Sequence, residues 1–493
     1  MSIMAVAFPH TASAPSPTPA PASPQRFLAC TVALMGSFIG YWLLNYSAFP
    51  LFDPVYLWTR EASAVVGGIT LTALAFASYW YPRLFASRRF LAATVSTMVV
   101  GSLVMTAGIF APLPAVLVCG AALVTVGTGL ANIIVGIGCI GLDMRRLGIS
   151  VTLAYVLAYA LRGAFALLPW GVNLALFCII PLLTVLIMAP YARPLFNQVY
   201  AEGSPAQAAV TAPSSFLPFG HQLFITLLLF RFIYGYTLTF GEVGRVPLLA
   251  LEALVPLGLV LAYVVLNRKD FSPDAFFQLS ILCSVAGFLM VSIVTANGSL
   301  VSTLLSCGTG FFEILMYFVL IALGAKNTVS ALPLFAWGSA MASWGTLLGA
   351  NFGRFTNAMA ADATMPSIIS ACIVFGIVAY VVLVQKSFSF SQTIQGITPL
   401  APLVSAHAAD ANADVDSPLS PVADRCAAIG KAAGLTDREQ EIFEYLARGR
   451  NVRFIQDELT VSYNTVKTHV SHIYAKLDVH SHQELIDLVE RPS

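Results

Sequence analysis

The residues most suited to chemistry in this chain lie in one short stretch, "VSYNTVKTHVSHIYAKLDV", at 461–479. A helix turns 100° per residue, so Val466, Val470, Ile473 and Leu477 fall on one stripe, which predicts an inward face. On a helix that enters the major groove, small polar side chains let the backbone approach the bases, and long basic ones reach base edges or phosphates. The opposite face carries Asn464, Thr468, Ser471 and Ala475, flanked by Lys467 and His472. The stretch therefore predicts a DNA-recognition helix.

Helix caps mark the elements that must hold this helix in place. Two capping boxes, T-x-x-E at 436–439 and S-x-x-E at 481–484, predict the starts of two helices. Between them, Asn451 and Ser462 are typical N-cap residues for two further helices, separated by a three-residue turn. A short helix, a tight turn and a longer helix form a helix-turn-helix unit, so we expect a small four-helix domain over 434–493.

These residues resemble the C-terminal DNA-binding domain of LuxR-type regulators. The segments "LTDRE" at 435–439 and "TVKTHVSHIYAKLDV" at 465–479 match the motifs of that family, whereas "NVRFIQ" at 451–456 departs from its usual "N-K-E-I-A". The resemblance implies a DNA-contacting surface, a last helix at 482–490 that serves homodimerisation, and double-stranded DNA as partner. The candidate DNA contacts are Asn451, Arg453, Asn464, Thr465, Lys467, Thr468, Ser471 and His472.

The charge of this region is unevenly distributed. Residues 435–493 hold seven Lys/Arg and ten Asp/Glu, whereas residues 448–477 hold five Lys/Arg and two Asp/Glu. Nucleic-acid-binding domains are usually basic, so the basic part is expected to face DNA. We expect modest affinity that depends on dimerisation and falls steeply with salt.

A metal site or an enzymatic centre is not indicated. Four of the seven histidines, His469, His472, His480 and His482, fall within fourteen residues, but no cysteine lies near them and one belongs to the family motif. The eight cysteines are scattered without a C-x-x-C pair. No nucleophile–base pair or phosphate-binding loop stands out, so we predict no cofactor and no enzyme.

The rest of the chain is far too apolar for a soluble protein. Of its 493 residues, 58% are hydrophobic and only 10% are charged, against about 25% charged in soluble domains. Apolar runs near twenty residues long are each sufficient to cross a bilayer. We predict an all-α polytopic membrane bundle over 26–386, after a disordered Pro/Ala/Ser-rich leader at 1–25. The twelve predicted spans are 27–46, 62–81, 90–110, 114–140, 148–168, 171–190, 219–240, 246–266, 274–295, 298–323, 329–350 and 364–385.

Basic residues at the span ends predict the orientation, because Lys and Arg are retained in cytoplasmic loops. With both termini cytoplasmic, only Arg60, Arg245 and Arg354 fall in external loops. The location expected is the bacterial cytoplasmic membrane. The cytoplasmic loops hold Arg83, Arg88, Arg89, Arg145, Arg146, Arg193, Arg268, Lys269, Lys326 and Lys386.

Six spans, a longer polar connection at 191–218 and six more spans resemble the organisation of the major facilitator superfamily of transporters. The loop motif of that family, G-x-x-x-D-R-x-G-R-R, is only echoed by "YPRLFASRRF" at 81–90, which lacks the aspartate. Since that motif helps these transporters change conformation, its departure disfavours transport.

Four ionisable residues fall inside predicted spans, where a charge costs at least about 2.5 kcal/mol and tends to face a partner or a cavity. Arg231 and Glu313 lie near mid-depth, and Arg162 and Glu252 lie nearer the outer third. For Arg231 and Glu313, two alternatives remain open: a structural ion pair, or contact with an unknown small-molecule ligand.

A polar, proline-dotted segment at 387–433 predicts a flexible linker between the bundle and the small domain, with a helix possible at 422–433. The favoured hypothesis is a membrane-bound one-component transcriptional regulator, in which the bundle senses a signal and the helix-turn-helix binds promoter DNA. The alternative is a secondary transporter with a C-terminal regulatory or dimerisation domain. A scaffold that has lost DNA binding is a third, weaker hypothesis.

Overall fold

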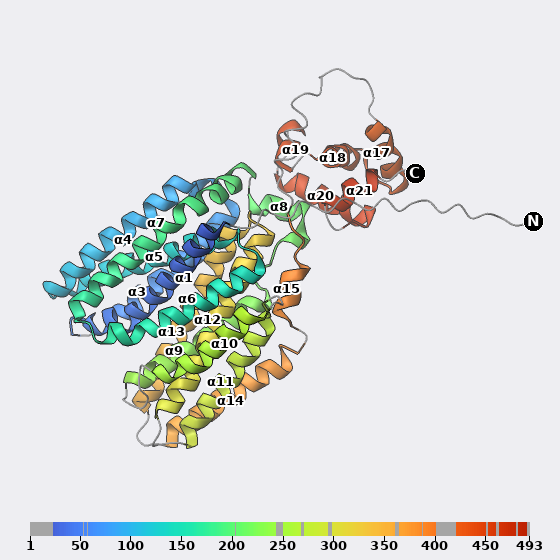
Figure 1. Ribbon diagram of the computed structural model, residues 1–493. Coiled ribbons are helices and arrows are strands. Elements are labelled where there is room, and N and C mark those ends of the chain that lie inside the picture. The colour runs from blue at the N-terminus through green and yellow to red at the C-terminus, as the bar shows by residue number, and fades with distance from the viewer. Residues whose placement is uncertain are drawn as a thin grey trace, which may run out of the picture.

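The computed structural model describes residues 23–490 apart from positions 53, 57, 203, 243–249, 268–270, 294–297, 360–363, 387, 401–420, 450–451, 460–462 and 480–481. Over these described residues the chain is helical and contains no strand. A long helical bundle carries a smaller helical domain beyond one of its ends (Figure 1). Residues 1–22 of the predicted leader lie outside the described residues, and its last two residues already belong to the first helix, which begins at Pro24.

The first half of the bundle packs as one group, in which α1 contacts α6 and α7, and α4 contacts α5. A single π-helical turn, η1 (Leu44–Ala48), interrupts the first span before it ends as α2 (Phe49–Phe52). The remaining helices of this half are α1 (Pro24–Leu43), α3 (Thr59–Trp80), α4 (Ser87–Phe110), α5 (Pro114–Cys139), α6 (Met144–Ala166) and α7 (Trp170–Glu202), with the short η2 (Pro82–Phe85) between α3 and α4.

The second half contains six longer helices, in which α9 packs on α13 and α11 packs on α12 and α14. Two short elements, α8 (Pro205–Thr211) and η3 (Pro213–Ser215), connect the halves. The helices of this half are α9 (Gln222–Glu242), α10 (Leu254–Leu266, after η4 at Leu251–Ala253), α11 (Pro273–Ile293), α12 (Gly298–Lys326), α13 (Ala331–Met359) and α14 (Thr364–Leu383).

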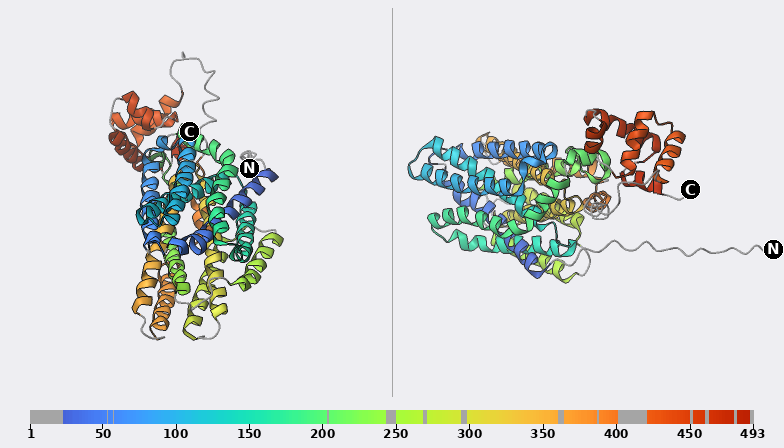
Figure 2. Two further views of the ribbon diagram at one scale, coloured as in Figure 1. Left: turned by 90° about the vertical axis from the view of Figure 1, so that its left-hand side faces the viewer. Right: turned by 90° about the horizontal axis from the view of Figure 1, so that it is seen from above.

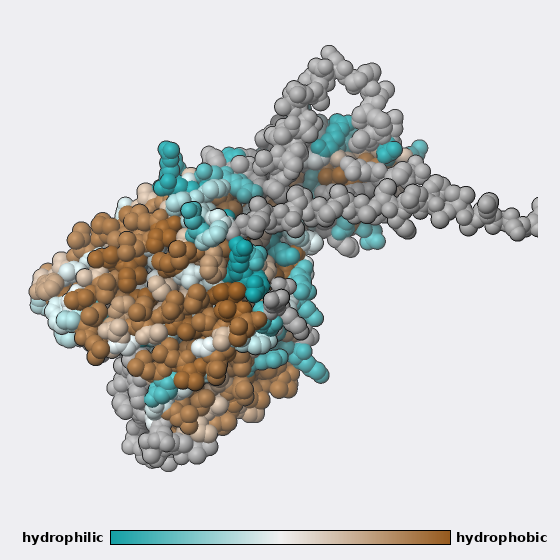
Figure 3. Space-filling view, in the orientation of Figure 1, coloured by the Kyte–Doolittle hydropathy of each residue, from teal (hydrophilic) through white to brown (hydrophobic). Residues whose placement is uncertain are grey.

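Each of the twelve predicted spans overlaps one of these helices, but the predicted span 246–266 matches α10 only from Leu254 onward. Within the described part of the chain, nine helices are long and apolar enough to cross a membrane, and the stretches Leu251–Leu266 and Ala371–Leu383 are shorter apolar helices. Large apolar side chains such as Leu103, Leu259 and Phe375 are exposed on the bundle surface, which is mostly brown in Figure 3. Helices satisfy their own backbone groups in lipid, so this surface belongs to a multi-pass membrane domain.

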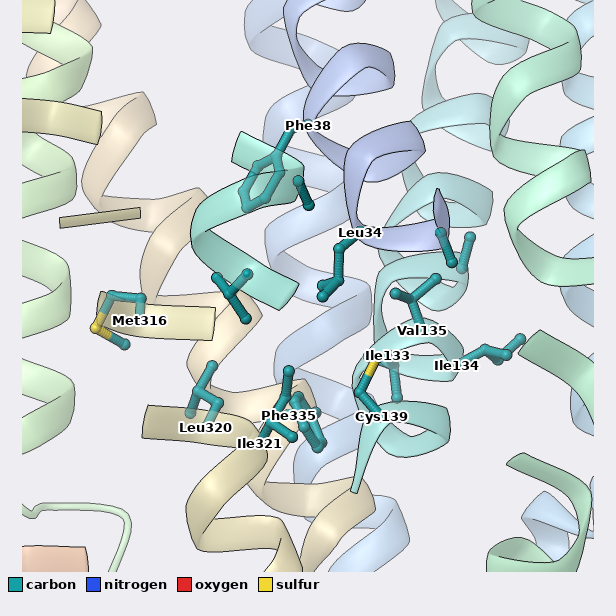
Figure 4. Packing of buried hydrophobic residues seen from close by; sticks show 14 of the residues in the cluster. Leu34, Phe38, Ile133, Ile134, Val135, Cys139, Met316, Leu320, Ile321 and Phe335 are labelled. Atoms are coloured by element: carbon teal, nitrogen blue, oxygen red, sulfur yellow. The ribbon is translucent and has the colours of Figure 1, made fainter. Parts of the chain in front are cut away.

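The two halves meet through a continuous apolar core. Figure 4 shows Leu34 and Phe38 of α1 beside Ile133 of α5, with Met316 of α12 and Phe335 of α13 on the other side. Glycine permits the closest approaches within this packing. At Gly36 an added Cβ would overlap the Thr184 side chain of α7, so the G-x-x-x-G pattern at 36–40 packs helices of one chain.

The small domain consists of α17 (Pro421–Ala432), α18 (Asp437–Ala447), α19 (Val452–Leu459), α20 (Tyr463–Leu477) and α21 (His482–Glu490). It has a hydrophobic core of its own, in which Ile442, Phe443, Val466 and Leu485 are fully buried. The capping box of Thr436 is present at the start of α18. The predicted box at Ser481 lies outside the described residues.

The prediction of a flexible linker over 387–433 was wrong at its start, whereas the helix expected as an option at 422–433 is present as α17. At its start, α15 (Phe390–Gly396) packs on the bundle through the buried Phe390, and Asp274 accepts hydrogen bonds from the Phe390 and Ser391 backbones at 2.7 and 3.2 Å. At its end, α17 joins the small domain through the buried Cys426. Single aromatic and apolar residues in a polar segment carry little periodic signal, so their packing was not visible in the sequence.

Candidate nucleic-acid interface and membrane cavity

The inward face of α20 is the one predicted. Val466, Val470 and Ile473 are fully buried in the core of the small domain, and Leu477 packs against it half-buried. The short α19 contributes the buried Val452 and Ile455 to the same core. This packing holds α19 and α20 as one unit and leaves the opposite face of α20 open.

The open face presents the side chains expected to meet DNA. Thr465, Lys467, Thr468, Ser471 and His472 are all exposed. The remaining candidates carry no described side chain: Asn464 lies on α20, Arg453 lies on α19, and Asn451 lies outside the described residues. A row of small hydroxyl-bearing groups with a lysine and a histidine at its rim suits a helix that enters the major groove.

A buried carboxylate fastens α18 to α20. Glu439 accepts hydrogen bonds from Lys476 Nζ at 2.7 Å, from the Thr436 backbone N–H at 2.8 Å and from Thr436 Oγ1 at 3.0 Å. The Lys476 ammonium, followed by these Thr436 donors, lowers the pKa of Glu439 from 4.5 to about 2. Lys476 also donates to the Gly434 carbonyl at 3.0 Å. Lys476, one of the five basic residues of 448–477, therefore has its charge paired with a carboxylate of its own domain.

One histidine of this region, His482, is half-buried between two helices of the small domain. His482 Nε2 lies 2.6 Å from the Leu446 carbonyl oxygen, and burial lowers the pKa of His482. This contact joins the start of α21 to the end of α18. Among the residues that the structure describes, no group of three or more His, Cys, Asp or Glu is placed to hold a metal ion.

Within the bundle, Arg231 of α9 and Glu313 of α12 form a bidentate ion pair. Arg231 Nη1 lies 2.6 Å from Glu313 Oε1, and Nη2 lies 2.7 Å from Oε2. The guanidinium also lies over the Tyr41 and Tyr234 rings, at 5.5 and 5.7 Å from their centroids. Such a geometry matches the planar fork of arginine to a carboxylate.

A cavity of about 210 Å³ lies between the two halves, lined by α1, α3 and α5 on one side and by α9, α12 and α13 on the other. Both Arg231 and Glu313 line it, so the ion pair and ligand contact are not mutually exclusive. The π-helical turn η1 contributes Leu44 and Asn45. Most of the remaining wall is aromatic or aliphatic, with hydroxyl groups such as those of Thr128 and Ser339.

A second charged cluster on the cavity wall was missed in the sequence. The buried Glu61 of α3 forms ion pairs with Arg354 of α13 and with Arg60 Nε, the latter at 3.2 Å. The pair of Glu61 and Arg354 joins the two halves of the bundle. Glu61 and Arg354 lie 293 positions apart and near helix ends, where exposed charges are common, so no local pattern distinguished them.

Comparison with known proteins decides the nature of the small domain. Residues 433–489 match the family "Bacterial regulatory proteins, luxR family". The small domain is a LuxR-type helix-turn-helix domain. It is 44% identical over 55 residues to "Transcriptional activator protein ExaE" of Pseudomonas putida, covering 11% of this chain and 26% of that protein. It is 47% identical over 53 residues to "Fimbriae Z protein" of Escherichia coli K12, covering 11% of this chain and 25% of that protein. The chain thus spans about a quarter of the length of these curated relatives.

Beside this LuxR-type domain, the membrane bundle is similar to solved transporter structures. A bacterial homologue of the iron transporter ferroportin in an outward-facing state aligns at 12% identity with a TM-score of 0.49, covering 75% of this chain and 98% of the other. The proton:xylose symporter XylE, a member of the major facilitator superfamily, aligns at 14% identity with a TM-score of 0.49 over the same shares.

Proposed function

We propose that this protein is a membrane-bound one-component transcriptional regulator, in which the bundle senses a small molecule and the LuxR-type domain binds promoter DNA. The observation that carries the proposal is the open face of α20, where Thr465, Lys467, Thr468, Ser471 and His472 are exposed over a fully buried apolar stripe. Helix-turn-helix proteins place the equivalent face in the major groove.

The DNA contacts proposed are these five residues together with Asn451, Arg453 and Asn464. Helix-turn-helix dimers bind two half-sites about one helical turn apart, so a homodimer through α21 would double the contact area. Since Lys476 is engaged by Glu439, few cations remain for phosphates, which supports weak binding by a single domain.

For the sensing site we propose the cavity between the halves, with a neutral, mainly apolar ligand. Both carboxylates among its described lining residues, Glu61 and Glu313, are already paired with arginine, so no free carboxylate remains there for a cationic ligand, and most of the wall is aromatic or aliphatic. An apolar cavity of about 150 Å³ holds benzene. A cavity of about 210 Å³ therefore suits a small monocyclic aromatic compound that bears one or two hydrogen-bonding groups.

The location proposed is the bacterial cytoplasmic membrane, with both termini cytoplasmic. Arg83 in η2 and Arg88 and Arg89 in the first turn of α4 lie at the bundle end to which α8 is fastened, since Ser204 Oγ donates to the Tyr79 carbonyl at 3.0 Å. The LuxR-type domain lies beyond this same end (Figure 1). Basic residues and a DNA-binding domain on one side support its assignment to the cytoplasm.

The DNA-binding half of the proposal is tested on fragment 421–493, which contains a hydrophobic core of its own. Its affinity is measured for DNA from upstream of its own and neighbouring genes at several salt concentrations. Lys467→Ala and Thr468→Ala should each weaken selective binding about tenfold, from about 1–3 kcal/mol per lost contact. Lys431→Ala, at an exposed lysine of α17, is the matched control. Equal binding by all four fragments would contradict the assigned face.

The sensing half is tested by thermal unfolding of the full chain in detergent with phenol and benzyl alcohol, against benzoate and benzylamine as charged counterparts. We expect the neutral compounds to raise the melting temperature and Ser339→Phe, which fills the cavity wall, to abolish this effect. Stabilisation by the charged compounds alone would contradict the ligand class. If the fragment binds no DNA even as an enforced dimer, transport assays of the same compounds test the secondary-transporter alternative.

A further inference from the structure

The short helix α8 lies between the bundle and the LuxR-type domain. It contacts α3 of the bundle, and it also contacts α19 and α20, the two helices of the helix-turn-helix unit. Its Val210 packs against the hydrophobic core of that domain. Figure 1 shows α8 between the bundle and the small domain, and the view from above in Figure 2 agrees, with a green segment beside the red domain.

Both halves of the bundle hold the segment that carries α8. On the side of the first half, Ser204 Oγ donates to the Tyr79 carbonyl at 3.0 Å, at the end of α3. On the side of the second half, Asn327 Nδ2, just after α12, donates to the Ser215 carbonyl at 2.9 Å in η3. A change in the angle between the halves must therefore displace α8 relative to at least one of them.

A further contact brings the linker to the same place. Thr398 Oγ1 lies 2.9 Å from Ser214 Oγ and 3.0 Å from Ser215 Oγ, so the chain leaves the bundle beside η3 on its way to the small domain. The LuxR-type domain is thus tethered close to α8, and a short tether gives a weak docking contact a high effective concentration.

Docking on α8 and DNA binding involve the same two helices, α19 and α20. In the helix-turn-helix mode the second helix lies in the groove while the first crosses the phosphate backbone, so both helices adjoin the duplex. The reading side chains on α20 stay exposed in the docked arrangement, so α8 does not bury them. Instead, the bundle end and the bilayer would obstruct the duplex on either side of its binding site. DNA has a persistence length of about 150 base pairs and is too stiff to bend away from them. The anionic cytoplasmic leaflet also repels phosphates within a Debye length.

We propose that α8 is a docking surface for the helix-turn-helix unit of its own chain, and that docking there competes with DNA binding. The inference rests on the proposed function, since it needs a domain that binds DNA. Ligand binding in the cavity would shift the balance between the docked and the DNA-bound domain by moving the two halves that hold α8. The shift can be no larger than the difference in the ligand's binding free energy for the two arrangements of these halves. A docked population of about 90% weakens apparent DNA affinity about tenfold.

The test compares DNA affinity of the full chain, in nanodiscs of phosphatidylcholine and phosphatidylglycerol, with that of fragment 421–493 on the DNA that the fragment selects. The fragment should bind about tenfold more tightly than the full chain. Val210→Asp in the full chain should recover most of that difference, because a carboxylate cannot stay in an apolar contact. Val210→Ile keeps the contact and should bind like the unaltered chain.

Amide hydrogen exchange supplies a readout that does not depend on DNA. Exchange of the amides of 205–211 should be slower in the full chain than in a chain ending at residue 400, and Val210→Asp should raise it without changing exchange in α3. Equal affinity of full chain and fragment, or a Val210→Asp chain that binds like the unaltered one, would overturn the proposal. A fragment that binds no DNA would instead defeat the proposed function and the competition with it, while protection of α8 would still report docking.

Discussion

Replacing Glu439 by glutamine tests the energetics of the small domain most directly. The three hydrogen bonds to Glu439 come from Lys476 and Thr436, and its side chain is almost fully buried. A carboxyl whose pKa falls from 4.5 to about 2 on folding contributes roughly 3 kcal/mol at neutral pH, at 1.36 kcal/mol per pKa unit. Glutamine keeps the volume and part of the hydrogen bonding, so we expect a loss of about 2 kcal/mol for Glu439→Gln at pH 7.

The pH dependence has a definite sign. Because folding lowers the pKa of Glu439, its contribution is fully present above pH 4.5 and is lost as the pH falls towards 2. The difference in unfolding free energy between unaltered and Glu439→Gln fragments 421–493 should therefore shrink over this range. Urea unfolding at pH 7 and at pH 3 measures it, and at pH 7 the melting temperature should fall by about 8–16 °C.

The matched control is Glu441→Gln, two positions along the same helix. Glu441 pairs with Arg438 at 2.5 Å, but both side chains are more than a third exposed, so the pair contributes about 0–1 kcal/mol at most. Equal stability of the two variants at pH 7, or a difference between unaltered and Glu439→Gln fragments that does not change with pH, would refute the assignment of Glu439 as the link between α18 and α20.

Three further outcomes are expected. In the bundle, Glu313→Ala leaves Arg231 buried without its counter-charge and should lower the free energy of unfolding by about 3–5 kcal/mol. Replacing both residues by methionine should lower it less, and thermal unfolding in detergent measures both variants. Gly36→Ala should destabilise the full chain by about 1–3 kcal/mol because its Cβ overlaps Thr184, whereas Gly171→Ala, which meets open space, should be nearly neutral in the same assay. If each protomer neutralises two phosphates, the affinity of a dimeric fragment for DNA should fall on the order of a hundredfold between 50 and 200 mM salt, and a flat salt titration would contradict binding through phosphates.

Local patterns in the sequence were enough to predict the elements of both parts. The apolar runs predicted helices at the observed places because a lipid-spanning helix needs only length and apolarity. In the small domain, the stripe of Val466, Val470 and Ile473 predicted the buried face of α20, since a 3.6-residue period is a property of neighbouring residues. The T-x-x-E box likewise predicted the start of α18.

Contacts between distant residues were not available from such patterns. Lys476 counted only towards the basic charge of 448–477, and its pairing with Glu439, 37 positions earlier, could not be predicted from the sequence. Glu61 and Arg354 read as ordinary charges near helix ends, and only the packing of α3 on α13 made them a buried pair. The linker was predicted to be flexible because its polar composition hides Phe390, which the bundle buries.

The sequence by itself determined which long apolar runs are helices and which side chains lie on the buried and exposed faces of α20, because these follow from propensity and period along the chain. The tertiary structure decided which charges neutralise each other, where a cavity remains between the halves, and that α8 meets the helix-turn-helix unit. Those features depend on how helices far apart in sequence are oriented in space. Orientation is a property of the whole packing, and no window of neighbouring residues contains it.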